Sequence, residues 1–301
     1  MRFGGRRISN NVGSQRGGGG GGFGGFGGGG GMPFGGGGLG CGGIAILIVL
    51  ALVFGINPMS LLGGGDGGPM VAPHQSSGQQ AGGGTAEEIC GADEVTKFSC
   101  QVLASTEDQW TRIFQAAGQQ YKPAGLIFYA GGGQSGCGAA QSAMGPFYCP
   151  SDQRIYLDTS FFTELQQRFK APGDFAQAYV IAHEVGHHIQ TITGISDRVR
   201  RAQSRASEAE GNALQVKMEL QADCYAGVWA AAEREAMEPG DAEEGLRAAE
   251  AIGDDTLQKA AQGYAVPESF THGTSAQRQQ WLQRGLQSGD PAQCDTFGNT
   301  I

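Results

Sequence analysis

The sequence predicts an α+β domain that is mainly helical, contains a small sheet and follows a single transmembrane helix. Three observations lead to this prediction: a glycine-rich N-terminal region with one apolar run, a short stretch of strand patterns, and helix patterns on both sides of that stretch. Strands that are grouped in this way, instead of alternating with helices, are typical of α+β domains.

The N-terminal region is expected to hold two flexible segments. Residues 1–38 are predicted to be a disordered cytoplasmic tail, because residues 17–38 are almost entirely glycine and cannot bury enough apolar surface to offset the entropy of ordering the backbone. Residues 63–86 are a second glycine-rich, polar run and are predicted to be a linker. The compact domain is therefore predicted over residues 87–301, which is long enough for one hydrophobic core.

One transmembrane helix is predicted over residues 39–62. The apolar run Ile44–Ile56 lies in a region without charged residues, and its flanks supply the roughly 20 positions that a membrane span needs. A cleaved signal peptide is the alternative, since the apolar core is short, but no clean small-x-small cleavage site follows it. Four arginines precede the run: Arg2, Arg6, Arg7 and Arg16. By the positive-inside rule they place the N-terminus in the cytoplasm and the large domain on the outer side of the membrane.

Charge and cysteine content agree with an extracytoplasmic domain. The formal net charge is −9, and it is more negative still without the N-terminal arginines, which disfavours nucleic acid as a partner. Six cysteines follow the apolar run, an even set that is expected to form disulfides in an oxidising compartment. These are Cys90, Cys100, Cys137, Cys149, Cys224 and Cys294. The pair Cys137–Cys149 is favoured, because the Gly-Pro segment between them suggests that the chain doubles back.

The domain is predicted to begin with helices and to continue with the sheet. Apolar residues at helical spacing predict a first helix over residues 93–104, and Thr106 followed by Gln109 is typical of a capping box that opens a second helix. Short apolar runs bounded by turn residues predict three strands, at residues 126–129, 147–149 and 154–157.

The rest of the domain is predicted to be helical. A long helix is expected from Asp174 to about Gln190, since Pro172 and Gly173 precede it and Gly194 lies just past its end. Thr274 with Gln277 forms a capping box for the last helix. Further helical segments are expected at residues 197–235, 241–252 and 274–285.

The long helix contains the sequence His183-Glu184-Val185-Gly186-His187. Two histidines four positions apart face the same side of a helix and can bind one zinc ion. Glu184 lies one step round the helix, where it can accept a proton from a metal-bound water. A chance match on an exposed helix is the alternative, but the neighbours are apolar, and a mid-helix Gly186 is costly unless another backbone approaches closely. His188 projects away from this face, so we expect it to be solvent-facing or packed, and not a ligand.

A second acidic motif follows on another predicted helix. A catalytic zinc needs a third protein ligand and one open position. The spacing of Glu219 and Asp223 suits Glu219 as that ligand and Asp223 as an acceptor for the free ring N–H of a ligand histidine, which fixes its tautomer. An ordinary salt-bridged helix face is the alternative for two acids four apart, but apolar and small residues surround these two.

These motifs together resemble the bacterial family of membrane-anchored neutral zinc metallopeptidases, in the gluzincin branch. The resemblance rests on the two motifs and on the runs Gly145–Pro150 and Ser269–Ser275, and it covers about residues 90–301 and the N-terminal span. It implies a zincin-like domain, in which Gly145–Cys149 is the edge strand that pairs with an extended substrate. A structural hairpin closed by a disulfide is the alternative for that strand.

The sequence thus predicts a zinc-dependent peptidase that acts on extended polypeptide at the outer face of the cytoplasmic membrane. Zinc polarises the peptide carbonyl and activates water, and Glu184 accepts a proton and passes it to the leaving amine. By resemblance, His272 donates a hydrogen bond to the oxyanion. Tyr225 and Tyr264 are rival donors, and a structural role for His272 is open. The alternative functions are a zinc-binding, non-hydrolytic envelope scaffold and a metal-free interaction module.

Overall fold

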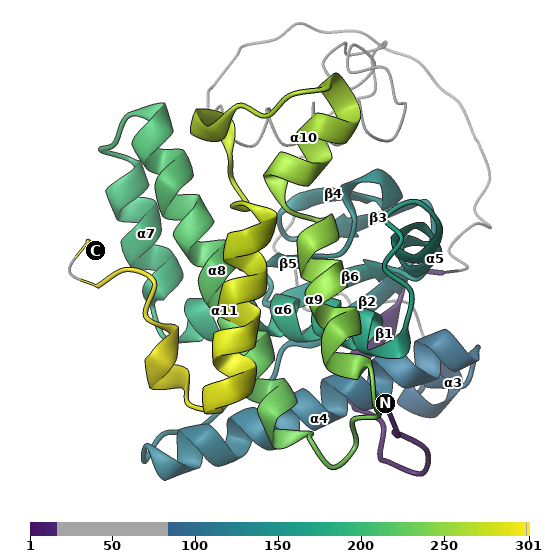
Figure 1. The fold of residues 1–301 in the computed structure, drawn as a ribbon. Helices are drawn as coiled ribbons and strands as arrows, with labels where there is room; N and C mark the ends of the chain where they lie inside the picture. Colours follow the sequence, from purple (N-terminus) through teal and green to yellow (C-terminus); the bar gives the residue numbers. More distant parts are fainter. Residues whose placement is uncertain (17–83, 299) are drawn as a thin grey trace, which may run out of the picture.

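The computed structural model describes residues 1–16, 84–298 and 300–301, and this part of the chain is a mainly helical α+β domain with a small mixed sheet (Figure 1). The predicted α+β class is confirmed. The helix predicted to span the membrane, residues 39–62, lies outside the described residues. Among the described residues, no helix is long and apolar enough to cross a membrane.

The main sheet has the strand order β1-β2-β6-β5. Strand β2 (Gly125–Tyr129) lies between β1 (Val12–Ser14) and β6 (Arg154–Asp158), and it is parallel to both. Strand β5 (Phe147–Cys149) is antiparallel to β6 and forms the other edge. Residues 126–129 of β2 are all buried, as expected for a strand that is covered on both faces. The three predicted strands are therefore confirmed.

A two-stranded hairpin projects from the end of β2. It consists of β3 (Gly132–Ser135) and β4 (Gly138–Gln141), which are antiparallel. The predicted disulfide Cys137–Cys149 is present, and it fastens the hairpin tip to the edge strand β5. The edge strand is thus held on one side by β6 and at its end by a covalent bond.

Residues 1–16 do not form the disordered tail that the sequence predicted. They cross helix α4 and end in β1, and Met1 and Phe3 belong to the main hydrophobic core, with 6% and 3% of their surface exposed. The adjoining glycines dominated the prediction, whereas this short segment has its own apolar residues to bury. Its arginines also bind acids of the domain, as described below.

Helices make up most of the domain. Their bounds are α3 (Ala86–Cys90), α4 (Glu94–Ala116), α5 (Ser160–Gln167), α6 (Asp174–Ile192), α7 (Ile195–Gln203), α8 (Glu208–Ala232), α9 (Asp241–Ala251), α10 (Asp254–Gln262) and α11 (Ser275–Ser288). Short 3-10 turns occur at η1 (Ser142–Met144), η2 (Pro267–Ser269) and η3 (Pro291–Cys294). Helices α6, α9 and α11 lie close to the predicted bounds.

One helix prediction needs correction. Residues 94–116 form one continuous helix, so the break predicted at Thr106 is wrong: this side chain is buried and donates back to the carbonyl of Leu103 instead of capping a new helix. The region 197–235 contains two helices, because Ser207 and Glu210 form a capping box that starts α8. The capping box at Thr274 and Gln277 is confirmed.

Glycines let α8 and α11 approach closely. A Cβ atom added to Gly285 would lie 2.0 Å from the carbonyl oxygen of Cys224, and one added to Gly227 would lie 2.2 Å from that of Leu282. Cys224 is also bonded to Cys294, so a disulfide ties α8 to η3. A third disulfide, Cys90–Cys100, ties α3 to α4. Three disulfides indicate an extracytoplasmic domain.

We expect Gly285→Ala and Gly211→Ala to change stability in opposite directions. Alanine at residue 285 would collide with the backbone of α8 and should cost roughly 1–3 kcal/mol or more. Gly211 is also helical, but a Cβ there meets nothing within 4 Å, so alanine should stabilise the protein by up to about 1 kcal/mol. Denaturant unfolding of the full chain measures both, and equal effects would contradict the close packing of α8 on α11.

Candidate metal centre

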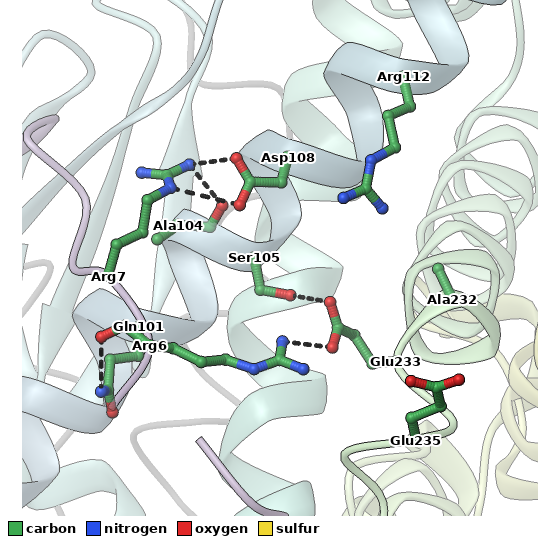
Figure 2. A pocket seen from close by; sticks show the side chains of 10 residues that line it. All are labelled: Arg6, Arg7, Gln101, Ala104, Ser105, Asp108, Arg112, Ala232, Glu233 and Glu235. Carbon is green, nitrogen blue, oxygen red and sulfur yellow. Dashed lines mark hydrogen bonds and ion pairs between the residues drawn. The ribbon is translucent and has the colours of Figure 1, made fainter. Parts of the chain in front are cut away.

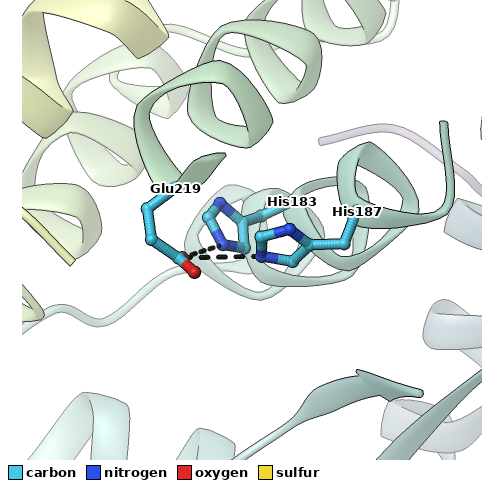
Figure 3. Close-up of side chains that lie close together, drawn as sticks. All are labelled: His183, His187 and Glu219. Atoms are coloured by element: carbon cyan, nitrogen blue, oxygen red, sulfur yellow. Dashed lines mark hydrogen bonds and ion pairs between the residues drawn. The ribbon is translucent and has the colours of Figure 1, made fainter. Parts of the chain in front are cut away.

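Helix α6 presents His183 and His187 on one side (Figure 3). The four-residue spacing brings the two imidazole rings together, with centroids 4.8 Å apart. His183 is buried and His187 is partly exposed, so the pair lies at the margin of the core. One side of the pair is therefore accessible to solvent.

Helix α8 brings the carboxylate of Glu219 to the same point. Its Oε2 atom lies 3.2 Å from Nε2 of His183 and 3.5 Å from Nε2 of His187 (Figure 3). Ligand atoms that surround zinc tetrahedrally at 2.0–2.2 Å are about 3.4 Å apart. The spacing of the donor atoms and their chemistry, two imidazoles and one carboxylate, both fit a zinc ion.

The approach of α8 to α6 depends on Gly186. A Cβ atom at this position would lie 2.9 Å from Cα of Ala222 and 3.0 Å from its carbonyl oxygen. Gly186 lies between the two histidines on α6, and Ala222 lies between Glu219 and Asp223 on α8. The glycine in the motif thus removes the side chain that would separate the ligands, which accounts for its place in the middle of a helix.

Each histidine has an oxygen partner on the ring nitrogen that faces away from Glu219. Nδ1 of His183 lies 2.8 Å from Oδ1 of Asp223, and Nδ1 of His187 lies 2.9 Å from Oε1 of Gln190. These acceptors favour the tautomer with the proton on Nδ1, which leaves a lone pair on Nε2 for a metal. The structure places Asp223 where the sequence predicted it. Gln190 was not predicted, although its position three residues after His187 is a local signal.

Asp223 lies in a fully buried network that sequence reasoning did not find. The side chain of Arg278, on α11, donates to both carboxylate oxygens from 2.9 Å, and the hydroxyl of Tyr179 donates to Oδ1 from 2.6 Å. Burial alone would raise the pKa of Asp223, but Arg278 and His183 hold it below its usual value. Asp223 therefore stays ionised as the partner of His183. No local pattern in the sequence marks Arg278 as buried.

Gln190 connects the centre to a disulfide. Its amide nitrogen donates to the carbonyl of Met218 and to Oε1 of Gln221, at 2.7 and 3.1 Å. Gln221 in turn donates to the carbonyl of Cys294, the partner of Cys224. Because both N–H groups of the Gln190 amide nitrogen are committed as donors, the orientation of the amide is fixed and its oxygen faces His187.

Glu184 lies beside the two histidines and is 7% exposed. Burial raises the pKa of its carboxyl group, although the charges of His187 and His183 oppose the increase. The backbone N–H of Tyr148, on the edge strand β5, opposes the increase as well. Glu184 is therefore a buried carboxyl group of raised pKa beside the candidate ligands.

His272 lies near the centre and is held by Asp254. Its Nδ1 is 3.1 Å from Oδ1 of Asp254, and Oδ2 of Asp254 accepts the backbone N–H groups of residues 271–273. The charges of His272 and Glu219 act on each other. The side chain of His272 is 29% exposed to solvent. Asp254 was not predicted, because it precedes His272 by 18 residues.

Three further residues, His188, Tyr225 and Tyr264, lie in different environments. His188 is fully buried and packs between Tyr121 and Tyr148, with Nε2 2.6 Å from the carbonyl oxygen of Lys122, so it is packed and not solvent-facing. Tyr225 is buried against Trp110. Tyr264 is 62% exposed in the loop after α10.

The charges of the ligand set favour a cation. Burial alone would raise the pKa of Glu219, but the facing His187 and His183 hold it well below its usual value. Burial alone would lower the pKa of His183, but Asp223 raises it to about 9. A metal ion must therefore displace a proton from His183 to bind.

Comparisons with known proteins agree with this centre. The sequence matches the model of a family described as "Putative neutral zinc metallopeptidase" over residues 1–297. It is 48% identical over 307 aligned residues to "Uncharacterized protein YpfJ" of Escherichia coli K12, and the alignment covers 100% of both chains. It is 42% identical over 223 residues to "Uncharacterized protein Rv2575" of Mycobacterium tuberculosis H37Rv, covering 69% of this chain and 73% of the relative. No solved structure matches the chain.

We expect Gln190→Ala to weaken zinc binding about 10- to 100-fold while the fold is kept, because His187 loses the acceptor that orients it. Competition with a zinc-chelating dye measures the affinity of the full chain. Gln283→Ala, at an exposed position of α11, is the matched control and should leave the affinity unchanged. Equal affinities of wild type and Gln190→Ala would show that this contact does not support the centre.

Proposed function

The chain belongs to the neutral zinc metallopeptidase family, and from that premise we propose that it is a zinc-dependent peptidase that hydrolyses peptide bonds in extended polypeptides. The observation that carries the proposal is the convergence of His183, His187 and Glu219 beside the buried carboxylate of Glu184. A metal held for structure alone needs no such carboxylate, whereas hydrolysis needs a base beside an open metal position.

The protein side chains divide the work of hydrolysis. His183, His187 and Glu219 would hold the zinc ion, which supplies Lewis-acid activation of water and of the peptide carbonyl. Glu184 accepts the proton of the attacking water and transfers it to the nitrogen of the leaving amine. Its raised pKa suits both steps. The carboxylate is a stronger base toward the attacking water, and its protonated form is then available to donate to the leaving amine.

His272 is the proposed donor to the oxyanion of the tetrahedral intermediate. Burial alone would lower the pKa of His272, but the hydrogen bond and charge of Asp254 raise it above its usual value. The doubly protonated ring therefore persists to higher pH, with Nδ1–H donated to Asp254 and Nε2–H free to donate to the substrate. Neither rival donor is favoured, since Tyr225 packs on Trp110 and Tyr264 extends toward solvent.

Strand β5 is the proposed binding edge for the substrate backbone. It pairs with β6 on one side and ends the described sheet, so its other edge can accept a strand, and its Tyr148 contacts His188 of the ligand helix α6. An extended peptide that adds to this edge would be recognised through backbone hydrogen bonds and with tolerance for its sequence. The disulfide Cys137–Cys149 and the contact of Tyr148 with His188 keep the edge in position, which also suits a purely structural hairpin.

The proposed site of action is the extracytoplasmic side of the cytoplasmic membrane. The three disulfides support an oxidising compartment. The apolar run within residues 39–62 supports attachment to the membrane without fixing how many times the chain crosses it.

Replacing Glu184 with Gln should remove hydrolysis and leave zinc bound. The amide keeps the shape of the side chain but cannot accept the proton, so the rate should fall by about 10²- to 10⁴-fold or more. A reduced and alkylated protein mixture, analysed by mass spectrometry for new N-termini, serves as the substrate, and elemental analysis reports the zinc. Bound zinc without turnover in the wild type would instead favour the envelope scaffold.

Asp254→Asn should move the alkaline limb of the pH profile of kcat/KM to lower pH. Asp254 raises the pKa of His272, so the donor form is present at low pH and is lost as the pH rises through that raised pKa. Without the carboxylate the loss occurs at a lower pH. Asp255→Asn, a neighbour that binds Ser275, is the control and should leave the limb in place. An unshifted limb in Asp254→Asn would exclude His272 as the donor.

A further inference from the structure

Residues 1–16 are built into the domain along their whole length. The carbonyl of Asn11 accepts the N–H of Leu126, and the N–H of Gln15 donates to the carbonyl of Phe128, so strand β1 is joined to the centre of the sheet. Nearer the N-terminus, the ring of Phe3 packs edge-on against Phe98 of α4, with centroids 5.5 Å apart. Removing the segment would expose apolar core and an unpaired edge of β2.

The arginines of this segment are counter-ions for acids of the domain (Figure 2). Arg6 pairs with Glu233 after the end of α8, and Arg7 binds the carboxylates of Glu107 and Asp108 and the carbonyl of Ala104 on α4. Figure 2 shows both arginines reaching across a crevice between the segment and the domain. Their charges thus have a structural use, separate from the membrane signal that the sequence suggested.

Further contacts at both ends fix the segment. Arg16 donates to the hydroxyl of Thr96 on α4 and to that of Thr159 just after β6. The α-ammonium group of Met1 lies 2.6 Å from Asp174, the first residue of α6, and 3.3 Å from Asp241, the first residue of α9. Together with Glu244 these acids form a cluster whose carboxylates would repel one another without a nearby positive charge. The segment therefore reaches the start of the helix that carries His183 and His187.

We infer that residues 1–16 are a structural part of the catalytic domain and lie on the same side of the membrane as the metal centre. A chain that crossed the bilayer once between residues 16 and 84 would separate β1 from β2 by the roughly 30 Å of hydrocarbon. The N-terminus then shares the compartment of the domain, and the cytoplasmic position predicted by the positive-inside rule is replaced. The inference rests on packing alone and does not depend on hydrolysis.

Substituted-cysteine labelling of the full chain tests this inference. Asn10→Cys reports on the segment and Gln283→Cys on the domain, since both positions are exposed. Each is introduced with Cys41→Ser, which leaves one free thiol beside the three disulfides. Spheroplasts are treated with a membrane-impermeant maleimide before and after permeabilisation. Gly4→Cys is a second reporter for the segment, because a Cβ there meets nothing within 4 Å.

Equal behaviour of the reporters is the expected result: all are labelled in intact spheroplasts, or all only after permeabilisation. Labelling of Gln283→Cys in intact spheroplasts, with both segment reporters protected until permeabilisation, would overturn the inference.

A charge exchange tests whether residues 1–16 pack on the domain. Arg6→Glu should lower the Tm, and Arg6→Glu with Glu233→Arg should recover part of the loss, whereas Arg247→Glu at an exposed position of α9 should change the Tm little. An unchanged Tm in Arg6→Glu would contradict the packing of residues 1–16 on the domain.

Discussion

The close crossing of α6 and α8 at Gly186 and Ala222 is the constraint on which the candidate centre depends. Two histidines on one helix provide half of a tetrahedral site wherever the helix lies, but the third ligand must come from another element. Contact between the backbones at this point places Glu219 against both Nε2 atoms and Asp223 against the opposite nitrogen of His183. The absence of a side chain at Gly186 thus determines where the candidate ligands and the residues that support them lie.

The crossing also buries charge, and the surrounding elements compensate for it. Asp223 is fully buried between the two helices, where an unpaired carboxylate would be strongly destabilising. Arg278 of α11 neutralises it, and α11 can reach it because Gly227 and Gly285 allow α11 to lie directly on α8. The sheet contributes on the other side, since the hydroxyl of Tyr148 on β5 contacts His188 of α6. The contacts that support the candidate ligands and those that hold the core together therefore come from the same few elements.

The part of this account that the sequence could predict is the part encoded locally. The spacing of His183 and His187, the acids on a later helix and the Gly-Pro turn between Cys137 and Cys149 are all visible within short windows. Arg278 and Asp254 could not be found, because their partners come from helices and loops distant in the chain, and a buried charged residue has no local signature. Thr106 misled the prediction, since a threonine can cap a helix or bond back to it from inside. Residues 1–16 were misjudged because neighbouring glycines outweighed Met1, Phe3 and Val12.

The central claim is that His183, His187 and Glu219 hold one zinc ion. Crystals of the full chain grown with zinc, with diffraction measured on both sides of the zinc absorption edge, test it most directly. We expect one anomalous peak per chain, at about 2.0–2.2 Å from Nε2 of each histidine and from a carboxylate oxygen of Glu219. A peak held elsewhere, such as at Asp174, Asp241 and Glu244, or no peak at all, would contradict it.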